Sequence, residues 1–172
     1  MVKRVVFFGA CALALLYGIL VLANVVDVSR KPSDEEQIRK AVVEMRQASL
    51  EGRDGGVMEY LSDSFELPAG MGSAEGPFNR GRDQVARFIK NAKVSSLEMT
   101  TTSVDVQGGT AFANVNAVGT LSYEPFFSNF EFSFPDMQIE FRKETRKRLL
   151  VVPDPTWAVV RVHGISADGV TQ

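Results

Sequence analysis

The chain has 172 residues, of which 45% are hydrophobic and 23% are charged, and these values are typical of a globular protein and not of a disordered one. Its 19 basic and 21 acidic residues give a net charge of −2, which argues against generic nucleic-acid binding because that needs a basic face. The single cysteine, Cys11, excludes a disulfide within the chain and a thiolate metal site.

Residues 5–26 form an apolar segment without charged residues, preceded by Lys3 and Arg4. As a helix this segment is about 33 Å long, which is enough to cross the hydrocarbon core of a membrane. The positive-inside rule places residues 1–4 in the cytoplasm and the rest of the chain outside it. The sequence therefore predicts a single-pass protein with a transmembrane anchor, a polar linker over 27–33 and an extracytoplasmic domain.

Two other interpretations of the apolar segment stay open. Val21-Leu22-Ala23 resembles the pattern of a signal-peptide cleavage site, and cleavage there would secrete the domain, although the apolar run is longer than the usual signal-peptide core. Lipoprotein processing at Cys11 is less favoured, because the hydrophobic stretch continues past the cysteine.

Helical patterns dominate the first half of the predicted domain, which covers residues 34–166. The expected helices cover residues 34–50, 54–62 and 82–92. Ser33 and Glu36 have the spacing of a capping box, and apolar residues then recur every three or four positions from Ile38. Glycines and prolines over 66–81 predict a loop before the third helix.

The second half changes to the two-residue period of β-structure. The expected strands cover residues 96–107, 110–123, 130–134, 137–152 and 157–165, and the tail 167–172 is expected to fray. Small residues alternate from Ala111 to Gly119, which favours a face on which a helix packs closely. Gly108-Gly109 and Pro153-Asp154-Pro155 predict turns. Helices followed by consecutive strands indicate an α+β fold with an antiparallel sheet.

This order of elements resembles the nuclear transport factor 2-like superfamily, also called cystatin-like or ketosteroid-isomerase-like. The resemblance covers about 34–165 and rests on four segments. They are Ile38-Arg39-Lys40-Ala41-Val42-Val43, Glu51-Gly52-Arg53-Asp54 leading into Met58-Glu59-Tyr60-Leu61-Ser62-Asp63-Ser64-Phe65, Gly81-Arg82-Asp83-Gln84-Val85 and Thr156-Trp157-Ala158-Val159-Val160-Arg161. It implies a curved antiparallel sheet wrapped around the helices as a cone that is open at one end. Enzymes of this superfamily use polar acid and base groups inside the cone, and no such set maps onto this chain.

Five polar side chains are candidates for the lining of a ligand pocket. They are Tyr60, Asn114, Asn116, Arg161 and His163. The two asparagines share a strand face, and Arg161 and His163 follow Trp157 at a spacing of two, where an arginine inside the cone would hold an anionic ligand. His163 is the only histidine and the default acid or base. For each of these residues the alternative is a solvated position on a strand.

Phenylalanine is concentrated in one short stretch of the chain. The interface candidates are Phe126, Phe127, Phe130, Phe132 and Phe134. Exposed, these rings would form an interface or a membrane-facing patch; turned inward, they would line an apolar pocket or pack into the core.

The sequence favours a membrane-tethered, extracytoplasmic and non-catalytic interaction or scaffold domain that binds a protein partner or a second copy of itself. The alternative is a small apolar-ligand binding protein, or an isomerase- or dehydratase-type enzyme that uses the cone cavity. Asp63 and Glu66 are considered as a carboxylate pair, with solvated acids as the alternative. Neither a metal nor a cofactor is expected, since the chain has no cluster of histidines and cysteines and no calcium-loop spacing.

Overall fold

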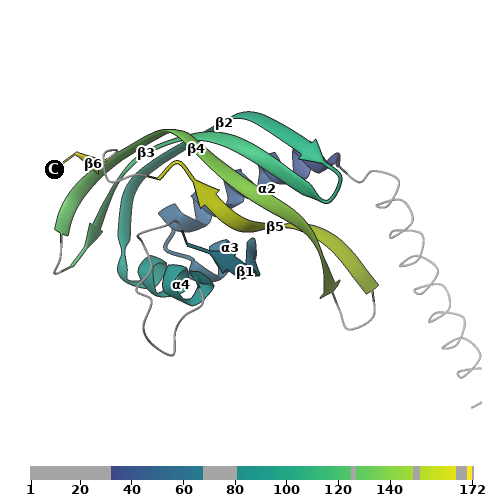
Figure 1. Cartoon of the computed structure of the whole chain (residues 1–172). Helices are drawn as coiled ribbons and strands as arrows, with labels where there is room; N and C mark the ends of the chain where they lie inside the picture. The colour runs from purple at the N-terminus through teal and green to yellow at the C-terminus, as the bar shows by residue number, and fades with distance from the viewer. Residues whose placement is uncertain (1–31, 68–80, 125–126, 149–151, 166–169, 172) are drawn as a thin grey trace, which may run out of the picture. The chain divides into compact units, whose positions relative to one another are not determined.

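The computed structural model describes residues 32–67, 81–124, 127–148, 152–165 and 170–171 (Figure 1). By its internal contacts the chain divides into two units, Met1–Ser33 and Asp34–Gln172, and the second unit is the domain described below. The predicted anchor over 5–26 lies outside the described residues. Within the described ranges, no helix combines the length and the apolar character that a membrane span requires.

The described elements, labelled as in Figure 1, are three helices and six strands. The helices are α2 (Asp34–Leu50), α3 (Asp54–Met58) and α4 (Gly81–Asn91). The strands are β1 (Leu61–Glu66), β2 (Lys93–Gln107), β3 (Thr110–Tyr123), β4 (Phe127–Arg148), β5 (Val152–His163) and β6 (Val170–Thr171). The expected first helix and the 110–123 strand are confirmed to the residue, and the third helix to within one residue at each end.

The strands form one sheet in the order β1-β5-β4-β3-β2, with β6 added to β4. Neighbouring strands are antiparallel except β1, which is parallel to β5. The expectation of a purely antiparallel sheet is therefore wrong, and the sheet is mixed. β1 lies between α3 and α4. The expected second helix over 54–62 is too long, because α3 ends at Met58 and Leu61 and Ser62 already belong to β1.

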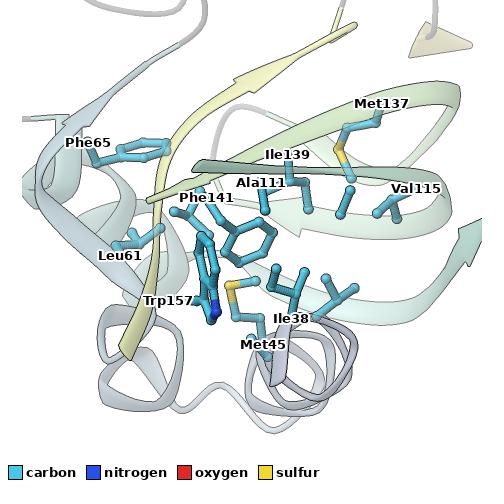
Figure 2. Packing of buried hydrophobic residues seen from close by; sticks show 14 of the residues in the cluster. Ile38, Met45, Leu61, Phe65, Ala111, Val115, Met137, Ile139, Phe141 and Trp157 are labelled. Carbon is cyan, nitrogen blue, oxygen red and sulfur yellow. The ribbon is translucent and has the colours of Figure 1, made fainter. Parts of the chain in front are cut away.

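The core lies between α2 and the face of the sheet that α2 covers, here called the concave face (Figures 1 and 2). The helix buries the predicted stripe, which consists of Ile38, Ala41, Val42, Met45 and Ala48. The opposing small residues Ala111, Ala113, Val115 and Ala117 are buried as well, which confirms the predicted close helix face on this strand. Burying each large side chain, such as Phe141 or Ile38, contributes about 1.5–3 kcal/mol.

The predicted turn at Pro153-Asp154-Pro155 is wrong, because these residues belong to β5 and pair with Lys147, Arg146 and Thr145 of β4. β1 pairs with β5 at Val159 and Arg161, so the other side of β5 at the two prolines is an edge. Proline is compatible with an edge strand because its missing N–H faces away from the ladder.

Three side chains tie the beginning of α2 to the sheet. The carboxylate of Asp34 accepts hydrogen bonds from Nζ of Lys143 at 2.8 Å and from Nε1 of Trp157 at 3.0 Å. The Lys143 ammonium also lies 5.3 Å from the centre of the Trp157 ring. Both hydrogen bonds lower the pKa of Asp34 below its ordinary value, and the bond from Lys143 has the larger effect.

Candidate functional site

A β-bulge at Val160 decides where the polar residues of β5 point. Phe141 of β4 pairs with Val159, but the preceding residue Glu140 pairs with Arg161, so Val160 is an extra residue in β5. An extra residue inverts the alternation of side chains beyond it. Arg161 and His163 therefore lie on the outer face of the sheet, and their predicted place on the face of Trp157 is wrong.

Charged and polar side chains gather on this outer face across β1, β5 and β4, and they surround a hollow of about 100 Å³. Its lining consists of Ser64, Glu66, Glu140, Arg142, Val160 and Arg161. The guanidinium of Arg161 donates a hydrogen bond to Glu66, and Nε2 of His163 lies 3.6 Å from Oε2 of Glu140. The hydrogen bond to Glu66 raises the pKa of Arg161 above its ordinary value, and the negative charges of Glu66 and Glu140 add to this effect.

The acidic and basic side chains that line the hollow balance each other in charge, and the exposure of the side chains around it argues against catalysis. Two carboxylates face two guanidiniums, and the side chains of Arg161 and His163 are 44% and 43% exposed. Such groups remain solvated, whereas a catalytic acid or base usually owes its shifted pKa to burial. Asp63 and Glu66 do not form the carboxylate pair considered from the sequence, because Asp63 accepts from Arg82 and Glu66 accepts from Arg161.

The two predicted asparagines also point away from the helices. Asn114 and Asn116 are exposed on the outer face of β3, between the buried residues of the concave face. Nδ2 of Asn114 donates to Oγ of Ser103 at 2.8 Å, and its Oδ1 accepts from Nε2 of Gln138 at 3.1 Å. The asparagines therefore belong to a solvated polar surface that continues to His163 of β5, which pairs with Gln138 of β4.

Tyr60 is the one pocket candidate that packs against the core. Its ring lies among the partly buried residues around the core, and its hydroxyl donates to the carboxylate of Glu44 on α2. The structure does not bring Tyr60 together with the other four candidates, which lie on the outer face. In the described part of the chain Ser62 is the buried polar residue, and its Oγ donates to Oε1 of Glu144 at 2.5 Å.

Three of the phenylalanine candidates form a row on the concave face. Phe130, Phe132 and Phe134, here called the phenylalanine row, pair with Leu121, Gly119 and Ala117 of β3 and are each half-buried. The rings of Phe132 and Phe134 stack with their centres 5.5 Å apart, and Phe134 packs against the core. Phe126 lies outside the described residues, and for Phe127 the structure describes the backbone alone.

Gly119 makes room for the row. A Cβ atom at this position would lie 2.7 Å from Cζ of Phe132 and 2.6 Å from the main-chain oxygen of Ser96, closer than real contacts allow. The ring of Phe132 thus covers a strand position that has no side chain of its own. The ring of Phe88 on α4 stacks on that of Tyr123 at the end of β3, with the ring centres 5.5 Å apart. The alternation of phenylalanine with Glu131 and Ser133 predicts a two-faced strand, but not which face is concave.

Comparison with known proteins finds likeness at the level of fold. No model of a protein family matches the chain. No curated protein matches it either.

Several solved structures resemble the domain, all at low sequence identity. An NTF2-like protein of unknown function in nutrient uptake from Rhodospirillum rubrum is 17% identical, with a TM-score of 0.56 over 73% of this chain and 93% of that one. An NTF2-like protein from Cytophaga hutchinsonii is 12% identical, with a TM-score of 0.54 over 76% and 96%. A ketosteroid isomerase-like protein from Erwinia carotovora atroseptica is 14% identical, with a TM-score of 0.53 over 76% and 93%. Identities this low speak for the fold alone, and the domain has the nuclear transport factor 2-like fold that its sequence resembles.

Proposed function

We propose that this protein is a non-catalytic binding module, held at the membrane by residues 5–26, which binds an apolar segment of a partner on its phenylalanine row. One observation carries the proposal: three half-buried phenylalanines follow one another on the concave face, beside a core that is already packed. Aromatic rings at such a place provide large contact area with little loss of conformational freedom.

The polar side chains beside the core support a binding role over an enzymatic one, because they are engaged with one another. Two pairs of polar side chains beside the core are bound to each other: Tyr60 donates to Glu44, and Lys143 donates to Asp34. The described ranges contain no group of three or more His, Cys, Asp or Glu residues that would hold a metal ion.

A second candidate function is the binding of a small apolar molecule on the same row. It is favoured by the direction of the rings, since a row on a concave face encloses a small ligand better than a flat patch does. An isomerase or dehydratase would need in addition an acid or base whose pKa is shifted by burial beside the row.

Photocrosslinking tests the proposal and separates the two candidates. Benzoylphenylalanine is introduced at position 132 of the full chain in its own cells, and at the exposed outer-face position 118 as a control. A polypeptide adduct at 132 and not at 118 is the expected result. An adduct of small-molecule mass would favour the second candidate, and equal adducts at both positions, or none, would overturn both.

The tether is tested separately on the membrane fraction. Retention of the full chain in membranes after alkaline extraction, with an N-terminus at or near Met1, is the expected result. An N-terminus at Asn24 would mean cleavage after Ala23 and a secreted domain. That result would overturn the proposed membrane tether and would leave the proposed binding role unaffected.

A further inference from the structure

From the strand edges of the sheet we infer that the edge of β4 at residues 130–134 takes up an extended peptide as an added strand, with β6 as its occupant in this chain. The inference rests on the proposed role of the phenylalanine row and names the ligand class, a polypeptide in extended conformation. Open strand edges present unpaired N–H and C=O groups, and proteins protect the edges that are not meant to bind.

Arginines protect the edge of β2. Nη1 of Arg39 donates to the main-chain oxygen of Thr101 at 3.0 Å, and Nε of Arg46 donates to that of Leu97 at 2.7 Å. Both side chains come from α2, which packs along β2. Two carbonyl groups that an incoming strand would need are therefore already bound.

Prolines and a helix protect the edges at the other side of the sheet. Pro153 and Pro155 stand in the part of β5 that extends beyond β1, where they remove the donors of that edge. Gly81 begins α4 beside β1, and a Cβ there would lie 2.7 Å from the main-chain oxygen of Phe65. The start of α4 thus lies against the end of β1, the strand at one end of the order of the sheet.

A further edge in the described residues belongs to β4, because β5 ends before it reaches residues 130–134. β5 pairs with β4 from Arg148 to Gln138, and then Gly164, with φ of +77°, turns the chain against Asp136. The edge beyond is Phe130-Glu131-Phe132-Ser133-Phe134. It lies between the irregular pairing around Asn129, which has φ of +52°, and the one around Pro135.

The chain itself shows that this edge accepts an antiparallel strand. Thr171 pairs with Glu131 and Val170 pairs with Phe132, so β6 covers two residues of the five. An added strand here places its alternate side chains beside the phenylalanine row on the concave face and beside Glu131 and Ser133 on the outer face. The chemistry points to a peptide with apolar residues toward the row and a basic residue near Glu131.

The test uses the full chain in detergent and a fluorescein-labelled peptide, Lys-Val-Thr-Val-Thr-Val-Lys, which extends the Val-Thr pair of β6. The control peptide has the same side chains but is N-methylated at each central amide, so it cannot pair as a strand. We expect the unmodified peptide to bind at least about tenfold more tightly, since added strands bind mainly through main-chain hydrogen bonds.

The double variant Val170→Pro/Thr171→Pro removes the donors of β6 without shortening the chain. It is expected to bind the unmodified peptide several-fold more tightly, because a competitor for the same edge is weakened. Amide exchange should slow at Glu131 to Ser133 when the peptide binds.

Equal binding of both peptides, or unchanged affinity in the double variant, would overturn strand addition. The proposed binding role is tested separately from strand addition, by the photocrosslinking adduct at position 132. An adduct there together with equal binding of the two peptides leaves the proposed function standing, whereas absence of the adduct removes that function whatever the peptides do.

Discussion

At position 119 the phenyl ring of Phe132 and the main-chain oxygen of Ser96 occupy the space that a side chain would need. We expect Gly119→Ala to lower the free energy of unfolding by about 1–3 kcal/mol, because the main chain of β2 has to move aside. Urea denaturation measures the difference. Gly109→Ala is the matched control, since a Cβ there meets nothing within 4 Å. Equal stability of the two variants would contradict the close contact at Gly119.

Asp34 gives a second prediction at this scale, because its lowered pKa links its charge to stability. A lowered pKa in the folded state means that the ionised carboxylate favours folding. The contribution is complete above the ordinary pKa of 3.8 and is lost as the pH falls through the lowered value. Asp34→Asn should therefore be less stable than the natural chain by about 1 kcal/mol at neutral pH.

The difference should shrink toward zero as the pH falls below the ordinary pKa of Asp34, which urea denaturation at a series of pH values measures. A difference that is the same at all pH values would mean that the amide loses packing or a hydrogen bond with Trp157, and not an ionic contact.

Single residues also mark the limit of what the sequence predicts about the site. Period-two alternation places Arg161 and His163 on the side of Trp157, but Val160 shifts both to the outer face. Nothing in the run Trp157-Ala158-Val159-Val160 separates a bulge from a regular strand, because all four residues are compatible with burial. The phenylalanine row, in contrast, follows correctly from alternation, and only the face it occupies needs the structure.

At the scale of the elements, the contact between α2 and the edge of β2 leads to a further prediction. Replacing Arg39 and Arg46 by methionine keeps much of each side-chain stem and removes the donors to Thr101 and Leu97. We expect a loss of about 1–3 kcal/mol for the two bonds together and faster aggregation, since the strand edge is then open.

Unfolding experiments measure the first effect, and light scattering over time at a fixed protein concentration measures the second. Lys40→Met is the control, because Lys40 is exposed on the same helix. If the double variant aggregates no faster than this control, the two arginines do not protect the edge.

Elements with a strong local pattern are those that the sequence predicts well. The buried stripe of α2 and the alternation of β3 give their bounds directly. β1 escapes prediction, because its burial does not alternate and it pairs with β5, a strand almost one hundred residues away. Pro153 and Pro155 are ambiguous for another reason, because proline is common both in turns and on the edge of a strand.

For the whole molecule, Trp157 allows one test of whether the domain unfolds as a unit. It is the only tryptophan of the chain, it is 4% exposed, and it contacts α2 and β4 through Asp34 and Lys143. We expect its fluorescence and the far-ultraviolet circular dichroism to change at the same urea concentration, as in a two-state transition.

A circular-dichroism transition that continues after the fluorescence change is complete would mean that the part of the sheet with the phenylalanine row unfolds separately from the core. Phe141→Ala, which removes a fully buried side chain from the core, is the comparison. It should move both transitions to lower urea together, by about 3–5 kcal/mol in stability.

The contact of Asp34 with Lys143 and Trp157 has a mechanical consequence. Asp34 is the first residue of α2, so a pull on the chain that precedes the helix reaches this contact before it reaches the rest of α2. Lys143 and Trp157 stand on adjacent strands of the central sheet and are paired with each other, so the load is shared between two strands. A force on the chain before Asp34 therefore acts on two strands of the sheet before the first turn of α2 unfolds.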